Sequence, residues 1–367
     1  MKILLINTYS MENAYRDWKN GVTPSHHLWG KIELDRRGKV QVDILPYQKY
    51  KFLDRIGKIF KIEFLDQQVR SLLVAHKYDA VYAPYGSATT KFLVLLKFLK
   101  LTRIPIVAVA HQPQFFSHHS NAIKRWIAKI SILQYDAMVF LSKKMKADTQ
   151  VNYHIPAKRA QKMFFHMDWG PDPDFYEKYR KPISVDQTTF AISAGTTGRD
   201  FDTLIEAFRG INFPLKIFTT ANQLPSVTDI PANVTIHSTG ITYKDLLQEY
   251  YKARIILVPL KIGADPTNTH GLTGLLDVIA MGKPTIITEN KNLDLDVEEE
   301  GIGYWAKRYD PEHWRSLLNG ILFDEAALTK MGENAMSLFT QTYNATLFAE
   351  GMEKIFLQVQ ANNKKKG

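Results

Sequence analysis

The chain has 367 residues, of which 45% are hydrophobic and 23% charged, an ordinary mix for a globular protein with material for two cores. This composition excludes a disordered or collagen-like chain, and the absence of cysteine excludes disulfides and thiolate metal sites. The start, MKILLINTYS, is interpreted as a strand and not a signal peptide, because it lacks a cleavage-site pattern. The longest apolar run, near Ile104–Ala110, is far shorter than the roughly 20 residues that span a bilayer. We therefore expect a cytoplasmic protein that is not integral to a membrane.

The net charge of +10 is unevenly distributed along the chain. Residues 1–170 carry 27 Lys/Arg and 12 Asp/Glu, a net of +15, whereas residues 171–367 carry 20 and 25, a net of −5. This split indicates two domains with different partners. The basic half should bind something anionic, such as nucleic acid, phospholipid or a phosphorylated substrate.

Strand-length apolar runs alternate with helical patterns along almost the whole chain, which predicts parallel α/β sheets. The strands are expected at Lys2–Asn7, Val40–Leu45, Ala80–Ala83, Ile104–Ala110, Ala137–Leu141, Phe190–Ala194, Leu215–Thr219, Val234–His237, Ile255–Pro259 and Pro284–Thr288. Helices are expected at His27–Arg37, Phe64–Ala75, Lys91–Leu101, Phe201–Arg209, Tyr243–Tyr251 and Ala345–Val359.

A Pro- and charge-rich stretch, Trp169–Val185, is interpreted as a linker between two sheets. We expect an N-terminal domain over residues 1–175, a second domain over 176–344, and a C-terminal helix with a basic tail over 345–367. Two open parallel sheets form a cleft, and ligands of such folds bind at the carboxyl ends of the strands.

The most informative segment is Thr267–Thr288, TNTHGLTGLLDVIAMGKPTIIT, a polar loop followed by a helix, a turn and a buried strand. Gly271 and Gly274 would let the backbone approach a ligand closely, and the N–H groups of the helix start would form an anion site. Asp277, one to two turns into the helix, could bind a ribose hydroxyl. A solvated helical Asp beside a glycine-rich turn explains the same pattern, and both interpretations remain open.

This segment resembles the nucleotide-sugar site of GT-B glycosyltransferases, particularly the retaining enzymes of glycosyltransferase family four, also called glycosyl transferases group 1. Their pattern is a Glu, seven residues, a second Glu, and then Ala-Met-Ala-x-Gly-x-Pro. Asp277-Val-Ile-Ala-Met-Gly-Lys-Pro matches the second half, with Asp277 replacing the acid that holds the donor ribose. The first Glu would fall at Thr269 and is missing, as in the sub-pattern with a Ser/Thr-x-Gly loop. The resemblance implies donor contacts from the loop and helix start, namely Thr269, His270, Gly271, Leu272 and Thr273.

A second stretch, Phe190–Phe208, resembles the strand, glycine loop and basic residue that open the second domain in this family. The family has an Arg and a Lys that neutralise the diphosphate. Arg199 falls at the place of the lysine, and the arginine is absent because Ala194 or a neighbour takes its place. Arg199 could instead be a surface residue, although a cation at a helix N-terminus is unfavourable unless an anion binds there. Gly195 and Thr196 complete this expected loop, and Ile241 of Gly240-Ile241-Thr242 resembles the loop that packs on the donor base.

In the first domain, Gly21–Gly38 resembles the first glycine loop of the family, with Gly21 as the residue of close approach. His111 directly follows the predicted strand Ile104–Ala110, where family members commonly have a His near the reacting sugar. Such a His can donate to a sugar hydroxyl or stabilise developing charge. A His that merely satisfies a loop carbonyl is the alternative. The expected catalytic residues are therefore His111 and Arg199.

Two Asp-x-Asp pairs, Asp294/Asp296 and Asp172/Asp174, resemble a metal motif of the other major glycosyltransferase fold. We discount both, because one lies in an acidic run and the other in the linker. Cationic side chains and helix N-termini can take the phosphate charge without a divalent metal. We expect no cofactor and no obligatory metal.

Three segments of the first domain mix lysines with large apolar residues, as surfaces at anionic membranes do: Phe52–Ile62, Lys91–Leu101 and Lys124–Lys129. Nucleic acid is the rival partner, but no recognised nucleic-acid module is present and the acidic second domain would repel a long polyanion. The expected partners are thus a nucleotide-sugar donor, a glycan or lipid-linked acceptor and an anionic membrane, with the protein peripheral at the inner face.

The resulting hypothesis is a GT-B, hexosyltransferase-like glycosyltransferase with two Rossmann-like domains and a C-terminal helix that returns to the first. It would move a sugar from a nucleotide-diphosphate donor, and the resemblance implies retention of configuration. One alternative is a nucleotide-sugar epimerase of the same fold. Another is a non-catalytic protein that binds nucleotide sugars or anionic glycans and lost turnover with the missing Glu and Arg.

Overall fold

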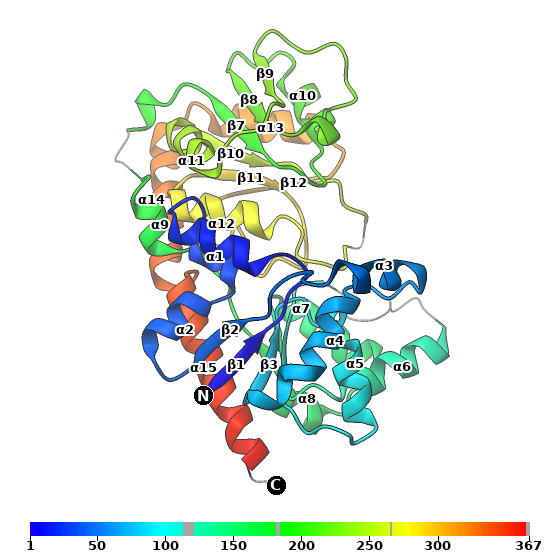
Figure 1. The fold of residues 1–367 in the computed structure, drawn as a ribbon. Coiled ribbons are helices and arrows are strands. Elements are labelled where there is room, and N and C mark those ends of the chain that lie inside the picture. Colours follow the sequence, from blue (N-terminus) through cyan, green and yellow to red (C-terminus); the bar gives the residue numbers. More distant parts are fainter. Residues whose placement is uncertain (113–120, 181–183, 265, 365–367) are drawn as a thin grey trace. The chain divides into compact units, whose positions relative to one another are not determined.

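A computed structural model describes residues 1–112, 121–180, 184–264 and 266–364. The chain forms two compact units (Figure 1). The first contains Met1–Gly21, Ser25–Trp169 and Ala345–Gly367, and the second contains Gly170–Asn344 together with Val22–Pro24. Each unit is an α/β domain built on a parallel sheet.

The sheet of the first unit has the strand order β2-β1-β3-β4-β5-β6, and all of its strand pairs are parallel. Its strands are β1 (Lys2–Leu5), β2 (Gln41–Ile44), β3 (Ala80–Ala83), β4 (Ile106–Ala110), β5 (Ala137–Phe140) and β6 (Phe164–His166). Its helices are α1 (Met11–Lys19), the 3-10 helix η1 (Ser25–Leu28), α2 (Lys31–Arg37), α3 (Lys51–Ile59), α4 (Leu65–Val74), η2 (Ala75–Lys77), α5 (Ser87–Phe98), α6 (Ala122–Ile132), α7 (Lys143–Asn152), α8 (Ala157–Met163) and α15 (Ala345–Lys364).

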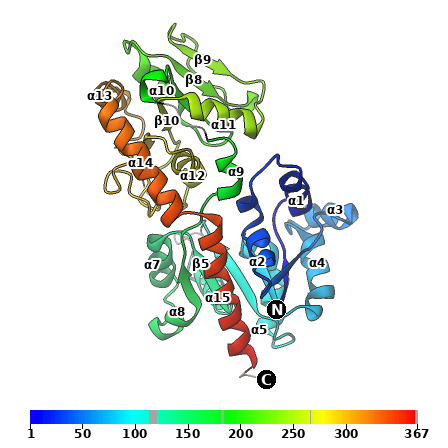
Figure 2. The ribbon, with the colours of Figure 1, turned by 90° about the vertical axis from the view of Figure 1, so that its left-hand side faces the viewer.

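The C-terminal helix α15 belongs to the first unit, as the sequence predicts. Figures 1 and 2 both show it beside α2. The ring of Phe356 packs edge-on against Tyr82 of β3, with 5.2 Å between the ring centroids. Arg37 at the end of α2 donates from Nε to Glu353 Oε2 at 3.1 Å. The helix therefore covers one face of this sheet, and the ion pair between Arg37 and Glu353 connects it to α2.

The sheet of the second unit has the order β9-β8-β7-β10-β11-β12, again with parallel pairs. Its strands are β7 (Ala191–Ala194), β8 (Leu215–Phe218), β9 (Val234–His237), β10 (Ile255–Val258), β11 (Thr285–Thr288) and β12 (Gly303–Ala306). Its helices are α9 (Pro173–Glu177), η3 (Val185–Gln187), α10 (Phe201–Phe208), η4 (Ala221–Gln223), α11 (Tyr243–Lys252), α12 (Leu272–Met281), α13 (Pro311–Ile321) and α14 (Glu325–Gln341).

This order is the Rossmann order, in which successive strands are added outward from the centre in both directions. The direction changes between β7 and β10, the two central strands of the unit. Helices α10 and α13 pack into the core on one face, whereas α12 lies on the opposite face, where Gly274 approaches Val258. The point where the direction changes is where ligands bind in open sheets of this kind.

Three features differ from the sequence-based expectation. The helix expected over His27–Arg37 is split into η1 and α2, because Trp29 and Gly30 have positive φ angles of 53° and 81° that no α-helix accommodates. Strands β6 and β12 were not predicted, since they are three and four residues long and lack a clear alternating pattern. Within the expected linker, residues 173–177 form α9.

None of the described helices has both the length and the apolar character needed to cross a bilayer.

Candidate functional site

Apart from Ile241, which precedes α11, the sequence-predicted donor residues of the second unit lie in or next to the connections that follow β7 and β10. The loop Gly195–Arg199 follows β7, and the loop that leads into α12 follows β10. The two loops are tied together, because Lys261 N–H donates to the Gly198 carbonyl at 2.9 Å and Arg199 pairs with Leu260 in an isolated bridge. The site is therefore a junction of two strand-to-helix connections.

Arg199 is half-buried in this junction and lies across two glycines. Its Nε donates to the Ala194 carbonyl at 3.1 Å. A Cβ on Gly195 would lie 2.5 Å from Nε, and a Cβ on Gly274 of α12 would lie 3.3 Å from Nη2. Among the residues that the structure describes, neither terminal nitrogen makes a hydrogen bond or ion pair. Burial lowers the pKa of Arg199, and the nearby Asp277 partly offsets this.

Asp277, on α12, is held by two tyrosines that come from other helices. Tyr243, the first residue of α11, donates to Asp277 Oδ1 at 2.6 Å, and Tyr176 of α9 donates to the same oxygen. The other carboxylate oxygen, Oδ2, accepts no hydrogen bond from any described residue. Burial raises the pKa of Asp277 to about 6, although the tyrosine hydroxyls and Arg199 act in the opposite direction.

The two tyrosine hydroxyls are also within hydrogen-bond distance of each other, so three oxygens form a closed triangle. With an ionised Asp277, two hydroxyl protons can satisfy two of the three contacts. A protonated Asp277 would supply the third proton. The triangle fixes the carboxyl of Asp277 on the face of α12 that carries Gly274.

The N-terminus of α12 offers backbone donors beside Arg199. Gly271 has a φ of +97°, a conformation that favours glycine, and begins the helix. The N–H groups of Thr273 and Gly274 bond to no described residue, as expected for the first turn of a helix. Leu272 differs from the expectation, since its side chain is buried and its N–H donates to the Thr269 carbonyl at 3.0 Å.

Two buried asparagines that follow β11 hold the loop before α12 in place by hydrogen bonds. Asn290 Nδ2 donates to the carbonyls of Asn268 and His270, at 3.1 and 2.9 Å, and Asn292 donates to the Pro266 carbonyl. His270 N–H in turn donates to Asn268 Oδ1 at 3.1 Å. Sequence reasoning missed both positioning residues, although polar ENKN at the end of a buried strand was a signal for them.

His270 faces the loop after β7. Its ring occupies the space beside Gly198, where a Cβ would lie 2.2 Å from Cε1, and Nε2 is 3.4 Å from the Thr197 carbonyl oxygen. Burial lowers the pKa of His270, and the charge of Arg199 lowers it further. His270 is thus a neutral imidazole at neutral pH. Thr196, which the sequence also places in this site, is exposed in the same loop.

Ile241 is half-buried and precedes Thr242, which caps α11 by accepting from Asp245 N–H at 3.2 Å. The next residue, Tyr243, is the one that reaches Asp277. Sequence reasoning expected the Gly240–Thr242 loop at the site but missed Tyr243 and Tyr176. A tyrosine at a helix start and another inside a presumed linker have no pattern that marks them.

The other two predicted residues, Gly21 and His111, are part of the first unit. Gly21 follows α1 with a φ of +68°, is exposed and has open space at its Cβ position. His111 directly follows β4, and its ring packs edge-on against Tyr85 at 4.4 Å between centroids. Burial lowers the pKa of His111 to about 4, so this imidazole is also neutral at neutral pH.

One aspartate of each Asp-x-Asp pair accepts hydrogen bonds from its own unit. Asp172 caps α9 by accepting from Phe175 N–H at 3.2 Å. Asp296 accepts from Trp305 Nε1 at 2.9 Å and from Glu298 N–H at 3.0 Å. Across the described ranges, no group of three or more His, Asp or Glu side chains is arranged to hold a metal ion.

No protein-family model matches this chain, and no curated protein matches it. Solved structures do match over nearly the full length. A glycosyltransferase from Rickettsia africae ESF-5 is 13% identical with a TM-score of 0.67, covering 98% of each chain. Anabaena HepE, solved with UDP and glucose, is 12% identical with a TM-score of 0.61, covering 96% of this chain and 98% of its own. MnaA of S. aureus, solved with UDP, is 13% identical with a TM-score of 0.57, covering 98% and 97%.

At such low identity the likeness concerns the fold. The chain has the GT-B fold, with two Rossmann-like domains, which confirms the fold class that the sequence predicts.

Proposed function

We propose that this protein is a glycosyltransferase that moves a sugar from a nucleotide-diphosphate donor to a glycan or lipid-linked acceptor, with retention of configuration. One observation carries the proposal. A half-buried Arg199 with unpaired terminal nitrogens among the described residues, the open N-terminus of α12 and the carboxyl of Asp277 adjoin one another within the second unit.

In this proposal the diphosphate binds between Arg199 and the N–H groups of Thr273 and Gly274. A planar guanidinium can bind two phosphate oxygens, and a helix N-terminus favours an anion. Gly274 and Asp277 are three residues apart and so share one face of α12. A ribose bound to Asp277 Oδ2 therefore lies about one helical turn from the phosphates, and the base lies toward Ile241.

The same groups would assist departure of the nucleoside diphosphate. Negative charge develops on the leaving phosphate, and preorganised donors at Arg199 and at α12 stabilise it without a metal ion. No cofactor or metal is part of the proposal. His111, neutral at neutral pH, would donate to a hydroxyl of the reacting sugar, and the departing phosphate would accept the acceptor proton on the same face. Retention rests on the family resemblance stated above.

The basic first unit extends the proposal to the acceptor. Its excess of positive charge supports an anionic membrane as the surface on which a lipid-linked acceptor is met, with the protein peripheral at the cytoplasmic face. Nucleic acid is not proposed as a partner.

Calorimetric titration with UDP and a panel of nucleotide sugars, followed by a donor-hydrolysis assay, tests this function. The wild type should bind one donor and release nucleoside diphosphate slowly without acceptor. Asp277→Ala should lose roughly 1.5–3 kcal/mol of donor affinity, because it removes a hydrogen bond to a charged acceptor. Asp186→Ala, which changes an exposed carboxylate of the same unit, is the matched control and should bind normally.

One result would remove a part of the proposal, and two would overturn the proposed activity. Equal donor affinity of Asp277→Ala and wild type would remove the ribose assignment. Donor binding without any hydrolysis or transfer would indicate a binding protein. Conversion of the donor sugar to its epimer in the absence of acceptor would indicate an epimerase.

A further inference from the structure

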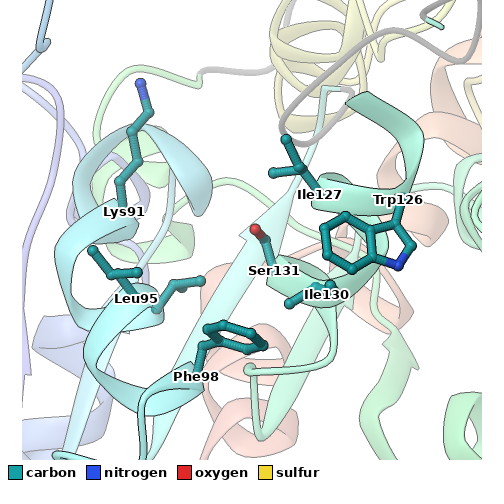
Figure 3. A pocket seen from close by; sticks show the side chains of 8 residues that line it. Lys91, Leu95, Phe98, Trp126, Ile127, Ile130 and Ser131 are labelled. Carbon is teal, nitrogen blue, oxygen red and sulfur yellow. The ribbon is translucent and has the colours of Figure 1, made fainter. Parts of the chain in front are cut away.

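An apolar groove of about 220 Å³ runs between α5 and α6 of the first unit. Figure 3 shows side chains of the two helices facing each other across it. Of the eight lining residues, Lys91 and Ser131 are polar, and the others are Val94, Leu95, Phe98, Trp126, Ile127 and Ile130. The groove is smaller than the roughly 300–1,000 Å³ of typical small-molecule sites. It is therefore better suited to surface contact than to enclosing a ligand.

The rims of the groove are unusually exposed for such large apolar side chains. Leu95 is 52% exposed, Phe98 49% and Trp126 61%, and the exposure continues to Ile123 at 69% on α6 and Leu101 at 70% after α5. Single exposed apolar residues are ordinary on protein surfaces. A contiguous group of them around one groove marks an interaction site.

The sequence of α6 shows which environment this site suits. Ile123, Trp126, Ile127 and Ile130 recur at helical spacing and so share one face. The positions between them include the cationic residues Lys124, Arg125 and Lys129. A helix with a basic face and a Trp-containing apolar face is typical of segments that lie in the interface of a bilayer. Tryptophan in particular prefers the level of the lipid headgroups.

Basic residues predominate around the groove, although Lys91 pairs with Glu63, which precedes α4, at 3.8 Å. Between Asp79 and Asp136 the chain contains seven Lys/Arg and no Asp or Glu, although about one residue in ten of the whole chain is acidic. Lys97 is bound to Asp136, which lies beyond this stretch. Among the described residues, Lys100, Arg103 and Arg125 make no ion pair. A negatively charged surface would complement these cations.

We propose that the α5–α6 groove is the surface by which the first unit enters an anionic lipid bilayer. Trp126, Ile127 and Phe98 lie among the headgroups and upper acyl chains, while Arg125 and its cationic neighbours contact lipid phosphates. Lys91 also lines a neighbouring hollow with Lys58 and Lys61 near the end of α3, and Asp54 and Glu63 line the same hollow. This inference rests on the membrane partner of the proposed function and assigns that partner to particular residues.

The test is co-sedimentation of the full-length protein with vesicles of phosphatidylcholine containing phosphatidylglycerol, compared with phosphatidylcholine alone, at low salt. Wild type should pellet with the anionic vesicles. The variant Trp126→Ser/Ile127→Ser should partition at least about tenfold less, because burial of each apolar group contributes to interfacial binding. Leu73→Ser/Val151→Ser removes two apolar side chains of the same unit that are more exposed than Trp126 and Ile127, on α4 and α7, and should pellet as the wild type does.

Depth is tested with lipids brominated on their acyl chains, which quench nearby tryptophan fluorescence. Binding should quench wild-type emission, and Trp126→Phe should lose most of the quenching while it still pellets. If wild type ignores anionic vesicles at low salt, the membrane partner itself is wrong. If the groove variant pellets as well as wild type, the groove assignment alone is wrong. If the groove variant instead converts a self-associated protein into monomers, the occupant is a second copy.

Measuring donor affinity distinguishes a failure of the groove assignment from a failure of the proposed function. The groove variant should bind the donor as tightly as wild type, because neither Trp126 nor Ile127 is among the residues proposed to contact the donor. Loss of vesicle binding with intact donor binding therefore supports the groove and leaves the donor site untouched.

Discussion

Asp277→Asn should make the protein more stable and weaken donor binding. Burial holds the pKa of Asp277 at about 6, against its ordinary value of 3.8. At pH 7 an ionised carboxyl with this shift, about two pH units, destabilises the folded state by about 3 kcal/mol relative to a neutral one. Asparagine stays neutral, and its side-chain oxygen can still accept from Tyr243 and Tyr176. The free energy of unfolding should therefore rise by up to about 3 kcal/mol.

The pH dependence makes this prediction specific. Between pH 3.8 and about 6 the folded protein holds a proton on Asp277 that the unfolded chain has released. The contribution of Asp277 to stability is thus fully present below pH 3.8 and is lost as pH rises through about 6. The stability difference between Asp277→Asn and wild type should be near zero below pH 4 and should grow to its full size by pH 7.

Urea denaturation of both proteins across this pH range measures the difference, with Asp186→Asn as the control for an exposed carboxylate. UDP titration at pH 7 should show weaker binding to Asp277→Asn, because a charge-assisted hydrogen bond becomes a neutral one. Equal unfolding of wild type and Asp277→Asn at pH 7, or a difference that does not change with pH, would refute the link between burial and the raised pKa.

Arg199→Ala should reduce turnover roughly 100-fold, which is the scale of losing one preorganised donor to developing charge. Arg209→Ala, at a surface arginine of the same unit, is the control and should not reduce turnover. Equal steady-state rates of Arg199→Ala and wild type at saturating donor would contradict this role. Gly195→Ala should weaken donor binding without unfolding the protein, since its Cβ would lie 2.5 Å from Arg199 Nε and displace the guanidinium, and normal binding by that variant would show that Arg199 has no fixed place in the site. EDTA should leave turnover nearly unchanged, because Arg199 and the N-terminus of α12 neutralise the phosphate charge. Strict dependence on manganese would contradict this and would indicate a metal site at Asp172/Asp174 or Asp294/Asp296.

Local pattern was enough to predict most of the architecture. The runs that became β3 and β9 were predicted at their observed bounds, because alternation and apolar content are properties of consecutive residues. The glycine-rich loops after β7 and before α12 were also expected from sequence, since turn chemistry and helix starts leave short-range signals. The junction of Arg199 with the α12 loop follows from these signals once both strands are placed in one sheet.

The apolar residues of α5 show that the sequence pattern alone could not separate core residues from exposed groove residues. Lys91–Leu101 was predicted to be helical, and most of it is in α5. Leu93 and Val94 are buried in the core, whereas Leu95 and Phe98 are exposed at the groove. All four are equally apolar, so their composition does not distinguish the core from a docking surface. Burial depends on which side of the helix meets the sheet, and the packing of the unit decides that.

The partners of Asp277 were decided by tertiary structure alone. Tyr176 lies 101 residues before it in the sequence and Tyr243 lies 34 residues before it, yet both hydroxyls meet the same carboxylate oxygen. No spacing rule connects residues on three different helices. Their meeting follows from the strand order of the second unit and from α9 folding where a linker was expected. The sequence could place an acid on a helix, but burial and two tyrosines, which together set its pKa, come from the packing of distant segments.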